Sequence, residues 1–247
     1  MPAILVEELQ KVYRSGSANP VKALDNISFE IPKGQIFGLL GPNGAGKSTV
    51  VKILTTITTP SGGRAQVQGF DVAKEPLQVR RQIGVVLQQT AVETLLTVRD
   101  NLLIYASLHG MEKAEAVKRM RLVAEEFELA ERLNDTVYEL SIGTKRRIQV
   151  AKVFMLDSPV IFLDEATTGM DPIMKRKVME RLKNEARKGR TILLTTQILS
   201  EAEELCDNIM IIDQGRKLAI GTLQELKSDV QGANLEEIFL KLVEDKE

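Results

Sequence analysis

The sequence contains the glycine-rich turn Gly41-Pro42-Asn43-Gly44-Ala45-Gly46-Lys47-Ser48-Thr49, which follows the apolar run Ile36 to Leu40 and precedes the helical pattern Val50 to Leu54. A strand, such a turn and a helix in this order are typical of a phosphate-binding loop. The glycines let backbone N–H groups point toward one anion, and the helix N-terminus adds partial positive charge. We expect Lys47 to reach the β- and γ-phosphates and Ser48 to bind Mg²⁺. By itself the turn indicates only nucleotide phosphate.

A second apolar run, Val160-Ile161-Phe162-Leu163, ends in the two carboxylates Asp164 and Glu165. Burying charge without partners is costly, so this placement indicates a site rather than packing. Beside the phosphate loop, Asp164 would hold Mg²⁺ directly or through water, and Glu165 would accept the proton of the attacking water. Two solvated carboxylates at a strand end are the alternative.

Short apolar segments alternate with helical patterns along most of the chain, which predicts an α/β fold with a mostly parallel sheet and helices on its faces. The expected strands are Ile4 to Leu9, Leu24 to Ile31, Ile36 to Leu40, Ala65 to Val67, Gly84 to Leu87, Val160 to Leu163, Thr191 to Thr195 and Ile209 to Ile212. The stretch Val98 to Glu139 instead carries apolar residues at helical spacing among many charges. It is interpreted as an inserted helical lobe. The stretch Ser15 to Pro20 reads as a surface loop.

Composition limits the classes of partner. The 247 residues carry 33 basic and 34 acidic side chains, and a net charge of −1 gives no overall electrostatic reason to expect nucleic acid. The single cysteine, Cys206, excludes an internal disulfide and a multi-cysteine zinc site, and we expect it to be buried near a helix end. The N-terminus lacks the pattern of a signal peptide. The apolar runs fall below the ~18–20 residues needed to cross a bilayer, so a membrane part would be on another chain.

A third motif, Leu140-Ser141-Ile142-Gly143-Thr144-Lys145-Arg146-Arg147, precedes the Asp164-Glu165 strand. Ser141 as a helix N-cap is a sufficient structural explanation. The octet also resembles the ABC signature, whose usual form is Leu-Ser-Gly-Gly-Gln, and the two carboxylates follow at the usual interval. With the phosphate loop, these motifs make the chain similar to the ATP-binding proteins of ABC transporters, and the resemblance covers almost the whole sequence.

The resemblance implies a fold and a domain organisation. The expected architecture is a P-loop ATPase core with a mostly parallel sheet, an N-terminal antiparallel β subdomain and an inserted α-helical subdomain. Residues 1–247 would form one ABC ATP-binding domain. Within it, residues 1–88 and 156–247 would form the ATPase core with the β subdomain, and residues 89–155 the helical subdomain that carries the signature.

The resemblance also implies roles for individual residues. Tyr13 would stack on adenine, Gln88 would sense Mg²⁺ and the attacking water, and Asp171 would communicate between the two sites of a dimer. A lone strand tyrosine, a solvated strand-end glutamine and a turn residue before proline are the respective alternatives. The implied ATP-binding set is Tyr13, Gly41, Pro42, Asn43, Gly44, Ala45, Gly46, Lys47, Ser48, Thr49, Ser141, Gly143 and Asp171; the Mg²⁺ set is Ser48, Gln88 and Asp164; the catalytic set is Lys47, Gln88, Glu165 and Gln197.

Two departures from the family pattern matter. The signature has Ile142 in place of its first glycine and Thr144 in place of glutamine, which we interpret as a subfamily trait. Gln197 stands where the family usually has its switch histidine. The single histidine, His109, lies in the helical lobe and is expected to be an ordinary amphipathic helix residue.

In the family, ATP is bound between the phosphate loop of one subunit and the signature of another. The resemblance therefore implies a second ABC ATP-binding domain, in a homo- or heterodimer, and an integral membrane permease on a separate chain. Motion would pass to that permease near Gln88 to Val98. The implied location is cytoplasmic, peripheral on the inner face of the cell membrane, and no nucleic acid is expected.

Four segments resemble the prokaryotic drug- and antibiotic-export branch: Leu96 to Leu102, Lys145 to Arg147, Thr167 to Pro172 and Leu235 to Leu240. The basic run Lys145-Arg146-Arg147 is nevertheless expected to be a solvated helix face. Two other functions stay open. One is a soluble ABC ATPase that moves no solute, and the other is a slow nucleotide-sensing regulatory subunit, which Gln197 suggests.

Overall fold

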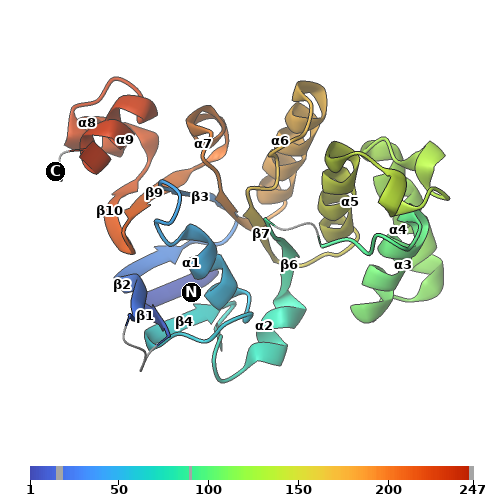
Figure 1. Ribbon diagram of the computed structural model, residues 1–247, viewed down its shortest axis with the longest axis horizontal. Helices are drawn as coiled ribbons and strands as arrows, with labels where there is room; N and C mark the ends of the chain where they lie inside the picture. The colour runs from blue at the N-terminus through green and yellow to red at the C-terminus, as the bar shows by residue number, and fades with distance from the viewer. Residues whose placement is uncertain (15–18, 89–90, 245–247) are drawn as a thin grey trace.

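The computed structural model describes residues 1–14, 19–88 and 91–244, in which helices surround two β-sheets (Figure 1). Residues 15–18 of the expected surface loop lie outside the described part, as do Gln89 and Thr90 of the segment expected to reach a permease. Within the described part, no helix combines the length and the apolar character needed to cross a membrane.

The N-terminal sheet is antiparallel and has the strand order β2-β1-β4-β5. Its strands are β1 (Ile4–Tyr13), β2 (Val21–Ile31), β4 (Gly62–Val67) and β5 (Phe70–Asp71). Alternating apolar residues on β1, such as Ile4 and Val6, are buried, as expected for a strand with one face on the core. The expected antiparallel β subdomain is confirmed.

The second sheet is mostly parallel, with the strand order β10-β9-β3-β8-β7-β6. All its pairs are parallel except the edge pair β9–β10. Every residue of β3, β7 and β8 is buried, which explains their continuous apolar sequences, since helices cover both faces of parallel sheets. The strands are β3 (Ile36–Leu40), β6 (Ile83–Val86), β7 (Val160–Asp164), β8 (Thr191–Thr195), β9 (Asn208–Asp213) and β10 (Arg216–Gly221).

The helices divide into those around the sheets and those of a lobe at one end of the molecule. The first group is α1 (Lys47–Leu54), α2 (Pro76–Gln82), α6 (Pro172–Arg187), α7 (Leu199–Leu205), α8 (Leu223–Val230) and α9 (Leu235–Glu244). The lobe consists of α3 (Val98–Leu108), α4 (Lys113–Glu126), the short 3₁₀ turns η1 (Ala130–Arg132) and η2 (Val137–Glu139), and α5 (Ile142–Phe154). In Figure 1 the lobe, in green and olive, lies at the opposite end from α8 and α9. The expected inserted helical lobe is confirmed and extends through α5.

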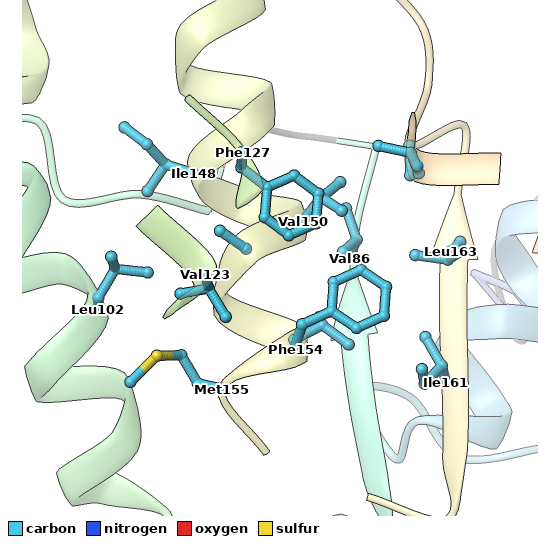
Figure 2. Close-up of a cluster of buried hydrophobic side chains, with 14 of the residues drawn as sticks. Val86, Leu102, Val123, Phe127, Ile148, Val150, Phe154, Met155, Ile161 and Leu163 are labelled. Carbon is cyan, nitrogen blue, oxygen red and sulfur yellow. The ribbon is translucent and has the colours of Figure 1, made fainter. Parts of the chain in front are cut away.

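One apolar cluster joins the lobe to the parallel sheet. Phe154 of α5 stacks on Phe127 with ring centroids 5.6 Å apart, and both belong to a buried cluster that includes Val86 of β6 and Leu163 of β7. Figure 2 shows α5 between the lobe side chains Leu102 and Val123 and the strand side chains. The lobe therefore shares its core with the sheet that carries the site. The subdomain boundaries at residues 88/89 and 155/156 stay predictions.

Candidate functional site

Four parallel strands end at one edge of the sheet, and the chemical groups predicted from the sequence follow those ends. The phosphate loop follows β3, Gln88 follows β6, Glu165 follows β7 and Gln197 follows β8. The carboxyl ends of parallel strands are where open α/β sheets bind ligands. The topology thus gathers residues from four distant parts of the chain.

The phosphate loop needs glycine at two positions where the backbone approaches a neighbour. A Cβ atom at Gly41 would lie 2.2 Å from the carbonyl oxygen of Ile212. Gly46, the N-cap of α1, has φ 110°, and a Cβ there would lie 2.8 Å from the carbonyl oxygen of Ala23. This left-handed backbone favours glycine. The loop therefore lies closely against β9 and β2 while it leads into the helix N-terminus.

Lys47 is 5% exposed and lies within the loop. Its Nζ donates hydrogen bonds to the carbonyl oxygens of Gly41 at 2.8 Å and Pro42 at 3.0 Å. Burial lowers the pKa of Lys47, while the charges of Glu165 and Asp164 oppose that shift. Lys47 faces a cavity of about 180 Å³ with lining residues Ala23, Asn43, Gly44, Ala45, Gly46, Lys47, Ser48, Thr49, Gln88 and Glu165.

Asp164 is 2% exposed and ends β7 beside the loop. Its Oδ1 accepts hydrogen bonds from Ser48 Oγ at 3.3 Å and from Thr195 Oγ1 at 2.6 Å. A hydroxyl and a carboxylate so close together are oxygen donors of the kind that Mg²⁺ prefers, and Mg²⁺ usually completes its shell with water and substrate phosphate. Ser48 and Asp164 therefore fit a magnesium ion that arrives with a nucleotide.

Both carboxylate oxygens of Glu165 accept hydrogen bonds from glutamine side chains. Gln88 Nε2 donates to Oε2 at 3.0 Å, and Gln197 Nε2 donates to Oε1 at 2.6 Å. Gln197 Nε2 also donates to Asn43 Oδ1 of the phosphate loop at 2.9 Å. The backbone of Glu165 has φ 51°, and its N–H donates to Thr195. The ends of β6 and β8 thus hold the carboxylate in one orientation toward the cavity.

The signature segment does not join this cluster. Ser141 caps α5 by accepting a hydrogen bond from the N–H of Thr144 at 3.2 Å, which confirms the N-cap interpretation. A Cβ atom at Gly143 would lie 3.1 Å from the carbonyl oxygen of Gly169, so the segment packs beside the turn after β7. In Figure 1 α5 lies at the lobe end of the molecule, away from α1.

Asp171 and Tyr13 also lie outside the cluster. The Oδ1 atom of Asp171 accepts a hydrogen bond from the N–H of Met174 at 2.9 Å and so caps α6. Tyr13 ends β1 opposite Val21, and the Nζ of Lys11 lies 5.1 Å from its ring centroid. Neither lines the cavity at the phosphate loop. Their expected roles toward ATP stay proposals.

Sequence reasoning missed Thr195, which bonds to Asp164 and to the N–H of Glu165. A signal was available, because a hydroxyl at the end of a buried strand lies at the same edge as the carboxylates. It also missed Glu201, a 5% exposed carboxylate that accepts hydrogen bonds from Thr167 at 3.0 Å and Thr196 at 2.9 Å and pairs with Lys175 at 2.6 Å. Glu201 thereby joins the segments that follow β7 and β8.

The expectation that Lys145-Arg146-Arg147 forms a solvated helix face is wrong for Arg146. Its side chain is buried, with the residue only 9% exposed. The guanidinium donates to the carbonyl oxygens of Leu87 and Gln88, at 3.1 and 3.0 Å. Helical periodicity turns Arg146 toward the sheet while its basic neighbours stay partly exposed.

Comparisons with known proteins agree with this geometry. The family model described as "ABC transporter" matches residues 24–168. A "Doxorubicin resistance ATP-binding protein DrrA" of Mycobacterium tuberculosis is 42% identical over 91% of this chain and 67% of its own length. A "Nod factor export ATP-binding protein I" of Rhizobium etli is 38% identical over 97% of this chain and 74% of its own.

Two solved structures share the fold. One is an ATP-binding subunit of an ABC transporter, with a TM-score of 0.90 and 31% identity over 97% of this chain and 99% of the other. The second is a dimeric ATP-binding cassette in a post-hydrolysis state, bound to ADP and Pi. It has a TM-score of 0.81 and 25% identity over 89% of this chain and 98% of the other.

Proposed function

This chain belongs to the ABC transporter family as an ATP-binding subunit, and we propose that it hydrolyses ATP to drive an exporter whose permease is a separate membrane protein. The observation that carries the proposal is the convergence of four strand ends on one cavity. Lys47 and Ser48 line that cavity together with Gln88, which follows β6, and Glu165, which follows β7. Asp164 and Gln197 lie directly behind them, in hydrogen-bond contact with Ser48 and Glu165.

The proposed chemistry assigns each side chain a separate task. Lys47 leaves its loop carbonyls to contact the β- and γ-phosphates, and the loop amides bind the same oxygens. Ser48 and Asp164, with Gln88, would hold Mg²⁺, which would supply positive charge against the phosphates. Glu165 accepts the proton of the attacking water. Its orientation by Gln88 and Gln197 supports this role, because both carboxylate oxygens are already fixed toward the cavity.

A complete site requires a second ATP-binding domain. Ser141 is the N-cap of α5 and Gly143 lies in its first turn, and this helix lies away from α1 of the same chain. They would therefore contact nucleotide that is bound to the phosphate loop of a partner domain. Asp171, near the same surface, would join the two sites, and Tyr13 would stack on adenine. The dimeric ATP-binding cassette among the structural neighbours supports this arrangement. The partner can be a second copy or a different chain of the same family.

The kinds of relative support the proposal of export and of membrane association. Relatives named for doxorubicin resistance and Nod factor export match most of this chain. We propose that the chain works on the inner face of the cell membrane and that the segment from Gln88 to Val98, at the exit of β6, transmits movement to the permease. Gln197 in place of histidine would make turnover slow, because an amide donates a hydrogen bond but carries no charge.

The test is co-expression with a candidate membrane permease, followed by purification in detergent. The expected result is a complex in which the membrane protein alters the ATPase rate, and in which Glu165→Gln retains assembly but loses hydrolysis. A matched variant, Glu131→Gln, changes an exposed carboxylate of the lobe and should behave as the native protein. A chain that stays soluble and hydrolyses ATP at the same rate with or without the membrane protein would instead support a soluble ABC ATPase.

A further inference from the structure

Arg146 is a buried cation that holds the backbone leading out of β6. Its Nη1 donates to the carbonyl oxygen of Leu87 at 3.1 Å and to Gln149 Oε1 at 2.9 Å, and its Nη2 donates to the carbonyl oxygen of Gln88 at 3.0 Å. The two carbonyls belong to consecutive residues. A planar guanidinium can bind both at once, which a lysine ammonium cannot do with the same geometry.

The charge of Arg146 is not explained by an ion pair. Among the described residues, no carboxylate lies within salt-bridge distance of it. Burial lowers the pKa of Arg146, and the negative charges of Glu165 and Asp164 act in the opposite direction. Arginine nevertheless stays protonated in proteins. A buried charge without a direct counter-ion is costly, and the hydrogen bonds to the carbonyl oxygens of Leu87 and Gln88 offset part of that cost.

The hydrogen bonds of Arg146 connect it, through Gln88, to Glu165, the carboxylate proposed as the base. Gln88, whose backbone carbonyl Arg146 binds, donates from its side chain to Glu165 Oε2 at 3.0 Å. Arg146 itself lies five residues after Ser141 on α5, a rise of about 7.5 Å along one helix. A short rigid segment therefore joins the signature to the residue that orients Glu165.

We propose that Arg146 is a positioning residue that sets Gln88 against Glu165 and so couples the position of α5 to the chain's own hydrolytic site. The proposal rests on the proposed roles of Glu165 and Gln88. When the signature end of α5 contacts a nucleotide on the partner domain, any displacement of the helix moves the guanidinium. The carbonyl of Gln88 then moves with it, and the Gln88 amide changes its position at Glu165.

The test compares Arg146→Gln and Arg146→Lys with a control on the same helix, Lys145→Gln. Lys145 is suited as the control because its Nζ contacts the carbonyl oxygen of Tyr138 within the lobe, on an exposed side. Mg-ATP affinity and steady-state hydrolysis are measured for each folded variant. For Arg146→Gln, we expect Mg-ATP affinity close to native and kcat lower by about tenfold to a hundredfold, the scale for a misplaced catalytic group. Arg146→Lys should be intermediate, and Lys145→Gln should be unchanged.

A double-mutant cycle with Gln88→Ala separates positioning from general destabilisation. If Arg146 acts through Gln88, Arg146→Gln should slow the Gln88→Ala protein little further. A full additional loss in that background, or a native kcat for Arg146→Gln, would overturn the proposal. If Arg146→Gln does not fold, the same double-mutant cycle with Gln88→Ala is measured with Arg146→Lys. A native kcat for both Glu165→Gln and Gln88→Ala would instead reject the proposed hydrolytic site itself, and the proposal with it.

Discussion

Replacing Gln197 by histidine should raise the ATP turnover of this protein. The Gln197 amide nitrogen donates to Asn43 Oδ1 at 2.9 Å and to Glu165 Oε1 at 2.6 Å, so its two N–H groups join the phosphate loop to the proposed base. An imidazole can keep one of these contacts and direct its other nitrogen toward the γ-phosphate. Unlike the amide, it can also carry a positive charge.

The magnitude follows from the difference between neutral and charged hydrogen bonds. A neutral hydrogen bond contributes about 0.5–1.5 kcal/mol and one to a charged group about 1.5–3 kcal/mol. We therefore expect the glutamine to provide about 1–2 kcal/mol less transition-state stabilisation than a histidine, which corresponds to a rate roughly five- to thirtyfold lower. We expect Gln197→His to raise kcat about tenfold and to leave Mg-ATP affinity nearly unchanged. Gln197→Ala, which loses both contacts, should be slower than the native protein.

The assay is steady-state phosphate release at saturating Mg-ATP for the three proteins at equal concentration, each with its partner domain where one is required. Mg-ATP affinity is measured in parallel, so that a change in binding is not taken for a change in chemistry. An unchanged or lower kcat in a folded Gln197→His protein that binds ATP would refute the reasoning. It would mean that the site has been rebuilt around the contacts of glutamine with Asn43 and Glu165.

Three further predictions test the phosphate loop, the lobe and the cysteine. Lys47→Ala should abolish tight Mg-ATP binding in a nucleotide titration, and native affinity would contradict the site. The Asn101 side chain is buried, exchanges hydrogen bonds with the backbone of Glu93 and donates to the carbonyl oxygen of Thr97, so Asn101→Leu should lower the free energy of unfolding by about 2–4 kcal/mol in urea. Cys206 is the C-cap of α7 and is only partly buried, whereas the sequence predicted a buried residue. Its surroundings still raise the pKa of the thiol, so thiol reagents at pH 8 should label the native protein much more slowly than the urea-unfolded protein; equal labelling rates would contradict the raised pKa.

The strands that carry the site could be predicted because their burial leaves a continuous apolar run. The expected spans Ile36 to Leu40 and Thr191 to Thr195 match β3 and β8. The edge strand β10 was not predicted, because its residues are exposed or partly exposed and form no buried apolar run. Its antiparallel pairing with β9 is what makes it a strand. His109 lies just past α3 as its C-cap rather than within the helix, followed by Gly110 with φ 77°.

The motifs predicted which chemical groups come together at the site, but not the tertiary contacts that hold them in place. The phosphate loop and the Asp164-Glu165 pair could be recognised because each carries its chemistry within a few consecutive residues. The contacts of Arg146 with the exit of β6 join residues almost sixty positions apart, and only the packing of α5 on the sheet determines them. Local sequence therefore predicted a solvated arginine, whereas tertiary packing buries it.

The most direct test of the hydrolytic site is the fate of Mg-ATP in Glu165→Gln. An amide cannot accept the proton of the attacking water, so hydrolysis should fall by at least about a hundredfold while nucleotide binding persists. Size-exclusion chromatography with Mg-ATP should then reveal a stable dimer with unhydrolysed ATP, and the protein should be monomeric without nucleotide. A variant that hydrolyses ATP at the native rate, or that binds ATP and stays monomeric, would contradict the account of the base and of the shared site.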